Sequence, residues 1–248
     1  MSYAFQVDTG GTLLTGLEAY YKLDETSGNR VDVSVNGRDM TDNNTVGATT
    51  GKVNGAAAFL TANSEYLSRA SFLDNPTNMS AAFWVKSATD ATYAFITKSN
   101  DVVNNDDAGW AIYASSVNNF ARAFFVTDVS NNLKYQGATS LIDDAWHFVV
   151  VSKSGTTITI YVDNGTDEAV DAGSAGTLGS TSNAHAVVIG AQAVPNLYFN
   201  GALDEIGLWS KALSAQERTD LYNAGNGQTM VQAGAAVVSG SNLLTLKA

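Results

Sequence analysis

One short segment with strictly alternating side chains constrains the fold more than any other feature. Residues 157–162 read Thr-Ile-Thr-Ile-Tyr-Val, which places Ile158, Ile160 and Val162 on one face of an extended chain. This period of two is typical of a half-buried β-strand. Residues 146–151 (WHFVVV) are apolar at both parities, which predicts a strand that is covered on both sides. The chain is therefore expected to bury strands between layers.

Similar segments recur along the chain, separated by turns. Further strands are expected at residues 17–23, 82–86, 94–98, 110–114, 121–127, 186–189 and 203–209. The 248 residues include 22 glycines and only 2 prolines, so the turns must depend on Gly, Asn and Asp. Many short strands with little helix predict an all-β fold, an antiparallel two-sheet β-sandwich.

One short helix is expected near the C-terminal end. Ser214 and Glu217 have the spacing of a capping box, and Gly225 stands where a left-handed residue would end the helix. Leu221 or Tyr222 would dock it on the sandwich. We therefore divide the chain into an N-terminal arm (1–16), a sandwich domain (17–225) and a C-terminal extension (226–248). The two ends are either additional edge strands or arms that dock onto a larger assembly.

The composition argues against several classes of partner. The net charge is −11 at pH 7, and no basic patch is present, so binding to nucleic acid or to anionic lipid is not expected. No apolar stretch approaches the length of about 20 residues that crosses a bilayer, so membrane insertion is not expected either. The chain has no cysteine, which excludes disulfides and thiolate metal sites. The first residues do not read as a secretory signal, which is compatible with export by another route, such as release in a virus particle.

Several motifs occur in the order found in one known family. They lie in residues 16–37, 51–68, 146–165 and 187–191, and in the closing segment 200–225 with its Leu-Asp-Glu-Ile strand and helix. Together they resemble the laminin-G-like family of concanavalin A-like jelly rolls, seen in extracellular and phage proteins. The resemblance implies a jelly roll with one short C-terminal helix. It does not imply a function, because lectins, adhesion modules, glycosidase appendages and virion proteins share this fold.

The resemblance also implies a calcium ion between the early loop and the closing strand. Carried over to this chain, its ligands would be Asp32, Asn36 and Asp204. Calcium takes six to eight oxygen ligands, so backbone carbonyls and water would have to complete the shell. Val35 stands where the family usually has glycine, which puts the loop geometry in doubt. The alternative is that Asp204, expected to point inward, is compensated by hydrogen bonds without a metal.

Catalytic motifs are missing. The Glu-x-Asp-x-x-Glu strand of related glucanases is absent, and with it the carboxylate pair that glycoside hydrolysis requires. The acids near residues 106–107 and 167–171 are expected in solvated loops. Of the two histidines, His147 is expected to be a packed or edge residue of a strand. The chain is therefore not expected to be an enzyme.

A polar loop offers a candidate ligand site instead. Sugars stack on aromatic rings and need planar polar side chains for their hydroxyl groups. The segment 99–113 supplies both types of group at Asn104, Asn105, Asp106, Asp107, Trp110 and Tyr113. The alternative is that Trp110 belongs to the core and the loop is a solvated turn. The tryptophans at 84, 146 and 209 are expected to serve packing.

These observations predict a non-enzymatic surface binding or attachment module, most consistent with a phage virion structural or decoration protein that adheres to a glycan. It would lie on the virion surface or outside the cell, contact neighbouring virion proteins through its terminal arms, and form a homo-oligomer. The alternatives are a purely structural assembly protein without a ligand and a carbohydrate-binding module of a secreted glycosidase.

Overall fold

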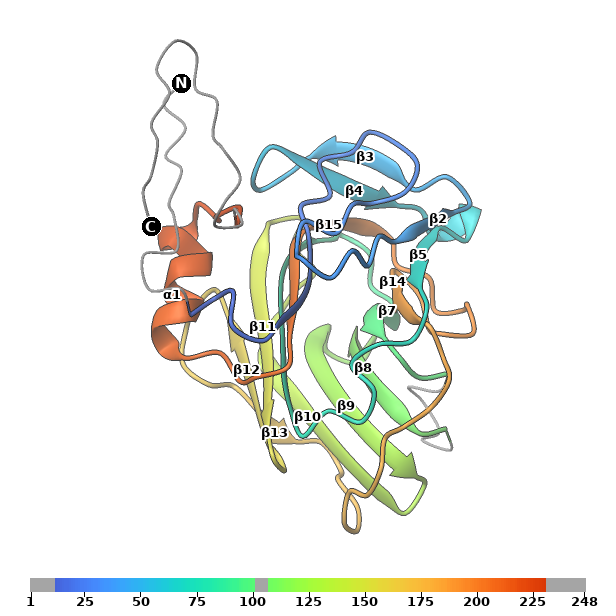
Figure 1. Ribbon diagram of the computed structural model, residues 1–248, viewed down its shortest axis with the longest axis vertical. Coiled ribbons are helices and arrows are strands. Elements are labelled where there is room, and N and C mark those ends of the chain that lie inside the picture. Colours follow the sequence, from blue (N-terminus) through green and yellow to red (C-terminus); the bar gives the residue numbers. More distant parts are fainter. Residues whose placement is uncertain (1–11, 101–106, 231–248) are drawn as a thin grey trace.

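The computed structural model describes residues 12–100 and 107–230, and within them the strands form two stacked antiparallel sheets (Figure 1). The first sheet has seven strands in the order β12-β11-β6-β15-β4-β3, with β1 paired to β15, and the second has eight in the order β13-β10-β9-β8-β7-β14-β5-β2. The strands of the first sheet are β1 (Leu17–Tyr21), β3 (Gly47–Thr50), β4 (Gly55–Phe59), β6 (Asn78–Lys86), β11 (His147–Ser154), β12 (Thr157–Val162) and β15 (Gly201–Trp209). Those of the second sheet are β2 (Thr41–Asn43), β5 (Tyr66–Arg69), β7 (Tyr93–Thr97), β8 (Gly109–Ala114), β9 (Phe120–Asp128), β10 (Asn131–Ser140), β13 (Val170–Asp171) and β14 (Val187–Ile189).

The core lies between the two sheets and follows the alternation of the sequence. In β12 the side chains of Ile158, Ile160 and Val162 are buried in this core, as their spacing predicts. The rings of Phe83 on β6 and Phe95 on β7 meet across the sheets with their centroids 5.4 Å apart. The predicted all-β jelly-roll sandwich is confirmed.

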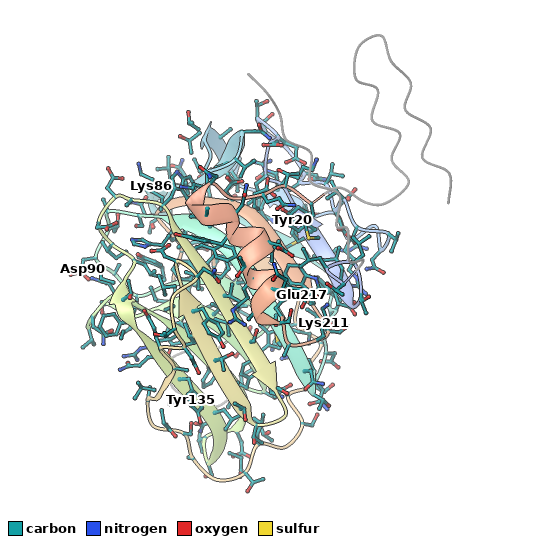
Figure 2. All side chains as sticks on the ribbon, turned by 90° about the vertical axis from the view of Figure 1, so that its left-hand side faces the viewer. Tyr20, Lys86, Asp90, Tyr135, Lys211 and Glu217 are labelled. Carbon is teal, nitrogen blue, oxygen red and sulfur yellow. The ribbon has the colours of Figure 1, made fainter. Side chains whose placement is uncertain are left out.

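The first sheet is covered on its outer face as well. In β11, Val149 and Val151 point into the core between the sheets, whereas Phe148 and Val150 belong to a second apolar cluster on the outer face. The helix α1 (Ala215–Tyr222) lies across this face (Figure 2). The continuous apolar run of β11 is therefore explained, because both of its faces are packed.

The capping box predicts the start of the helix correctly. The Glu217 amide donates to the Ser214 hydroxyl at 3.2 Å, and the Ser214 amide donates to the Glu217 carboxylate at 2.8 Å. The helix ends earlier than expected, because the left-handed residue at its C-terminus is Asn223 (φ 48°) and not Gly225. Leu221 is buried, and the Tyr222 ring stacks on Trp84 with centroids 5.8 Å apart and an angle of 14°.

The described parts of the two chain ends pack on the same outer face. The Trp209 indole donates to the Leu13 carbonyl at 2.7 Å, and the Met230 amide donates to the Tyr20 hydroxyl at 3.2 Å. Residues 1–11 and 231–248, which hold the rest of the predicted arms, lie outside the described residues. No helix in the described part of the chain is long and apolar enough to span a membrane.

Candidate functional site

The predicted ligand loop falls partly outside the described residues, which do not include Asn104, Asn105 and Asp106. The structure places Trp110 and Tyr113 on β8, where both are buried. The Trp110 indole is 0% exposed and donates to the Leu73 carbonyl at 3.0 Å. Trp110 thus lies in the core, which is the alternative that the sequence left open, and it offers no ring face to a sugar.

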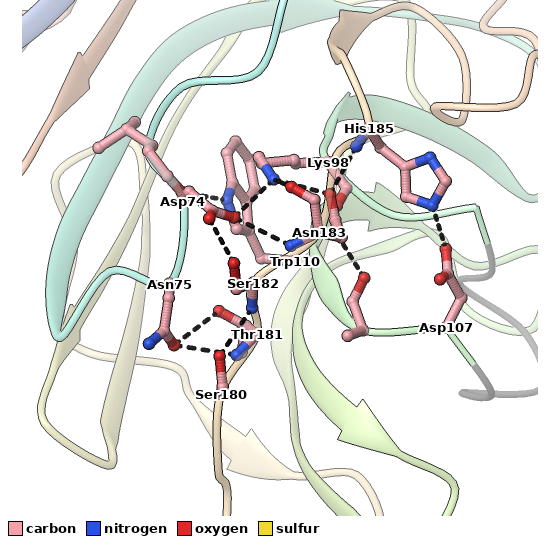
Figure 3. A network of polar contacts seen from close by, with 12 residues as sticks. Asp74, Asn75, Lys98, Asp107, Trp110, Ser180, Thr181, Ser182, Asn183 and His185 are labelled. Carbon is pink, nitrogen blue, oxygen red and sulfur yellow. Dashed lines mark hydrogen bonds and ion pairs between the residues drawn. The ribbon is translucent and has the colours of Figure 1, made fainter.

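Asp107 belongs to a polar network at the rim of the sandwich (Figure 3). Its carboxylate pairs with His185 at 2.9 Å. Next to it, the fully buried Lys98 ammonium donates to Asp74 at 2.8 Å and to both the carbonyl and the side-chain oxygen of Asn183 at 2.7 Å. The hydrogen bond from Lys98 lowers the pKa of Asp74 to about 2. These contacts hold three loops together, and we assign the network to structure.

The predicted calcium ligands in the early loop are engaged by the protein. Asp32 accepts hydrogen bonds of 2.8–3.0 Å from the backbone amides of Tyr20, Ser34 and Arg38 and from the Ser34 hydroxyl. The Asn36 amide group donates to two carbonyls of β1 at 2.9 and 3.0 Å. Both side chains therefore brace the loop against β1.

Asp204 differs from them, because it is fully buried and only partly compensated. Its Oδ2 accepts from the Val53 amide at 2.9 Å, whereas its Oδ1 has no hydrogen-bond partner among the described residues. Burial, with a smaller contribution from the charge of Asp24, raises the pKa of Asp204 to about 7. Burial likewise raises the pKa of the adjacent Glu205 to about 8.

The three predicted ligands make different contacts: Asp32 and Asn36 engage β1 and their own loop, whereas Asp204 engages Val53. Within residues 12–100 and 107–230, no group of three or more His, Asp or Glu side chains is arranged to hold a metal ion. Asp32 and Asn36 are already engaged by hydrogen bonds of the loop, so the ligand set drawn from the resemblance stays a prediction. One observation favours a cation here: the buried Oδ1 of Asp204 has no hydrogen-bond partner among the described residues. Calcium binding stays a prediction.

A groove on the outer face of the first sheet is the best candidate for a ligand site. Its volume is about 510 Å³, within the range of small-molecule binding clefts. It is lined by Thr49, Thr50, Ala58, Phe59, Leu60, Lys86, Ser87, Ala88, Thr89, Asp144, Trp146, Asn200, Gly201 and Ala202. These residues come from five segments, which lie on neighbouring strands of the first sheet and in the loops at their ends.

The strand register explains why the face is hollow here. Lys86 pairs with Ala202, Ala202 with Ala58, and Ala58 with Gly47, so that these four residues form one row across four strands. Three of the four have no side chain beyond a methyl group. Outward-facing residues in such a row stand side by side about 4.8 Å apart, and without side chains they leave a trough.

Larger side chains stand beside this trough. His147 pairs with Val85, which brings the half-buried Trp146 beside Lys86 at one end of the row. The Lys86 ammonium pairs with Asp144 at 3.4 Å, and their side chains are 38% and 69% exposed. Such an exposed pair is weak, so both groups remain available to a ligand. The groove thus combines one aromatic surface with cationic, anionic, hydroxyl and amide groups.

The segment that carries Asp144 and Trp146 is held from two sides. The Asp144 amide donates to the Ser87 carbonyl at 3.0 Å. The His147 ring lies between two carboxylates, 2.8 Å from Asp163 and 3.1 Å from Asp143. The hydrogen bond to Asp163 is the main cause that raises the pKa of His147. His147 is therefore a structural residue of the rim, and it positions the groove wall.

The sequence did not indicate this groove. Trp146 was expected to be a packed strand residue. It does pack, half-buried, against the outer apolar cluster, but it precedes β11, which begins at His147, and it also lines the groove. Trp84 and Trp209 are buried as expected. The small residues of the trough are visible in the sequence, but only the register of the strands aligns them.

The fold defines a jelly-roll module with a groove on one sheet. Residues 61–217 match the family model described as the concanavalin A-like lectin/glucanases superfamily. The match covers more than half of the chain, and the chain belongs to this superfamily. No curated protein matches the chain.

Three solved structures illustrate the likeness. The binding domain of Paraclostridial Mosquitocidal Protein 1 has a TM-score of 0.64 and 12% identity, with 86% of this chain and 53% of that chain covered. Domain 4 of AbnA, a GH43 extracellular arabinanase from Geobacillus stearothermophilus in complex with arabinotriose, has a TM-score of 0.58 and 17% identity, with 82% and 97% covered. A structure from work showing that cell entry of botulinum neurotoxin type C depends on interaction with two ganglioside molecules has a TM-score of 0.62 and 12% identity, with 86% and 52% covered. This chain spans about half the length of the two toxin structures, and at these identities the likeness shows the fold alone.

Proposed function

We propose that this protein is a non-enzymatic binding module that attaches to glycans through the groove beside Trp146. The observation that carries the proposal is the trough of small residues flanked by a half-buried indole and by polar side chains. A sugar presents C–H faces that pack on an aromatic ring and hydroxyl groups that need hydrogen-bond partners. The arabinanase domain and the neurotoxin that share the fold are described with arabinotriose and with gangliosides, and this supports the choice of ligand class.

The groove favours binding over catalysis. Most glycosidases need two carboxyl groups that flank the scissile bond. Among the described residues that line the groove, Asp144 is the only acid. The acids with strongly raised pKa values, Asp204 and Glu205, are buried and do not line it. We therefore propose retention of the ligand without chemical change.

Titration calorimetry with glycans that bind on an array tests this proposal. We expect Trp146→Ala to weaken binding at least tenfold, and Trp146→Tyr to retain much of the affinity because it keeps a ring. Tyr161→Ala is the matched control, since Tyr161 is a partly buried ring on the same outer face that packs under Arg218, 3.6 Å from its centroid, and does not line the groove. Equal affinities of the Trp146→Ala variant and the parent would contradict the proposal, as would an array without any bound glycan.

We also propose the setting that the sequence suggests, a phage virion or the cell exterior, with the terminal arms contacting neighbouring virion proteins and with assembly of several copies of this chain. Electron microscopy of the native particle tests it. Arms that touch no neighbouring subunit would contradict it, as would a protein that sediments as a monomer and is absent from particles.

A second candidate is a carbohydrate-binding module of a secreted glycosidase. One observation favours it, because 97% of the arabinanase domain is covered by this chain. An intact native protein that also contains a hydrolase domain would decide for this candidate, while glycan binding at the groove is common to both.

We also propose that a calcium ion binds, with Asp204 as its main ligand. The unpartnered Oδ1 of Asp204 supports a cation there, with the early loop contributing less than the sequence suggested. Unfolding of the parent and of Asp204→Asn, with and without calcium, tests it.

A further inference from the structure

We infer that the groove takes an internal segment of a linear, neutral polysaccharide that lies across the strands of the first sheet. The inference rests on the proposed function and adds the orientation, the charge and the minimum length of the ligand.

The direction follows from the row that forms the floor. The row that lines the groove runs from Trp146, just before β11, over Lys86 on β6 and Ala202 on β15 to Ala58 on β4, and Thr49 and Thr50 continue it on β3. It therefore crosses four gaps between neighbouring strands. At about 4.8 Å for each gap, the row is about 19 Å long. A trough of this length that runs at right angles to the strands fits a chain of sugars better than a single ring.

Two apolar contacts set the minimum length. Trp146 stands at the β11 side, and Leu60, which is 52% exposed, follows the last residue of β4. Three gaps between strands separate β11 from β4 in the sheet, which is about 14 Å. A single sugar ring cannot contact both side chains. A longer oligosaccharide can pack one sugar on each.

The edge of the sheet leaves room for the ligand to continue. β3 is the last strand of the described sheet on that side, and Thr49 and Thr50 on it are exposed and line the groove. A ligand that reaches these hydroxyl groups can pass over the edge of the sheet. This favours an internal segment of a chain over a terminal sugar.

The charges favour a neutral ligand. Lys86 and Asp144 are the charged residues among those that line the groove, and they pair with each other at 3.4 Å. Their charges cancel at the site, whereas the whole chain carries −11. A polyanionic or sialylated glycan is therefore repelled at long range and finds no net positive charge in the groove.

Calorimetry with chains of increasing length tests the inference. The probes are neutral arabino-, xylo- and cello-oligosaccharides from disaccharide to hexasaccharide, with sialyllactose as the anionic terminal sugar. For the series that binds, we expect affinity to rise at least tenfold from disaccharide to tetrasaccharide and then to level off. Sialyllactose is expected to bind at least tenfold more weakly than the tetrasaccharide.

Two variants locate the ligand in the trough. Ala202→Leu fills the middle of the floor and should weaken hexasaccharide binding at least tenfold. Leu60→Ser should weaken the hexasaccharide several-fold and leave the disaccharide unchanged. Val170→Ser is the matched control, because Val170 is a similarly exposed apolar residue, at 58%, on a strand of the other sheet. Thermal unfolding of each variant shows that it is folded.

The outcomes separate the two proposals. Binding that depends on Trp146 but does not change with chain length, or that is strongest for sialyllactose, overturns this inference and leaves the proposed function standing. The absence of binding by every glycan overturns both.

Discussion

Replacement of Asp204 by asparagine tests how the buried acid of the closing strand is compensated. Asp204 is 0% exposed, and one of its oxygens has no hydrogen-bond partner among the described residues. An ionised carboxylate in such a place is costly, and burial accordingly raises its pKa from 3.8 to about 7. The amide side chain of the Asp204→Asn variant would keep an oxygen that can accept from the Val53 amide but would carry no charge at any pH.

The sign of the effect follows from proton uptake. Between about pH 4 and about pH 7 the folded protein retains a proton on Asp204 that the unfolded chain has released, so the free energy of unfolding falls as the pH rises through this window. The stabilisation is complete below the unfolded pKa of 3.8 and is lost as the pH passes about 7. Because the sequence pI is about 4.4, measurements are best made from about pH 5.5 upward. From there to the folded pKa, at about 1.36 kcal/mol for each pKa unit, the loss is about 2 kcal/mol.

The assay is urea unfolding followed by tryptophan fluorescence at about pH 5.5 and about pH 9, in chelator and in calcium. In chelator, we expect the stability difference between Asp204→Asn and the parent to shift by about 2 kcal/mol in favour of the variant as the pH rises. A difference that does not change with pH would refute the argument that Asp204 is protonated when folded. If calcium binds at Asp204, it will stabilise the parent at about pH 9 and leave the variant unchanged, because a ligand bound only by the folded state raises its stability. Equal midpoints of the parent with and without calcium would dismiss the metal.

Three further predictions concern the helix cap at Ser214, the buried Lys98 network and His147 beside the groove. Ser214→Ala removes the helix cap and should cost about 1 kcal/mol of stability in urea unfolding, and an unchanged midpoint would contradict the assigned cap. Lys98→Met leaves Asn183 and the partly exposed Asp74 without their buried donor. We expect the free energy of unfolding to fall by about 2–3 kcal/mol, which is below the usual range for a broken buried pair because water can reach Asp74. A fall of less than about 1 kcal/mol would show that the network is dispensable. The pKa of His147 is raised in the folded protein, so its stabilising effect is present below its ordinary value of about 6.5 and is lost as the pH rises through the folded value. His147→Gln should therefore lower the unfolding midpoint more at about pH 6 than at about pH 9, and equal losses at both would argue against the paired imidazolium.

The sandwich could be predicted from the sequence because the patterns that indicate its strands and helix lie within short segments of the chain. The alternation in residues 157–162 and the capping box at Ser214 each depend only on residues a few positions apart in the sequence. The strand at residues 110–114 was also predicted, and the structure has it as β8 (Gly109–Ala114). Of the two interpretations of Trp110, the core position is the one found, and the sugar-stacking one is not supported because the indole is buried. Both parities of β8 are buried, so neither Trp110 nor Tyr113 faces the solvent, and this double cover depends on the packing of distant segments.

The groove required information that no single segment contains. Its floor combines Ala58 and Ala202, which become neighbours only through the pairing of β15 with β4. Each is an ordinary small residue within its own strand. The loop that the sequence favoured had its polar groups in one segment, and for that reason it was easier to notice. The role of Asp32 was hidden in a similar way, since the loop sequence does not reveal that the backbone amides of Arg38 and Tyr20 are its donors.

The outer face of the first sheet shows how one surface is divided between stability and recognition. Where α1 covers it, the outward residues are large: Trp84 and Phe148 pack against Tyr222 of the helix, with ring centroids 5.8 Å from it in both cases. Two positions further along β6 the outward residue is Lys86, and its row continues into alanine and glycine. Large side chains there would need a cover of their own, because exposed aromatic surface of that extent is unfavourable in water. Small side chains need none, and they leave a trough whose wall is Trp146. The end of the helix therefore marks the beginning of the groove, and a change that extended the helix cover over Lys86 would be expected to close the site without disturbing the core between the sheets.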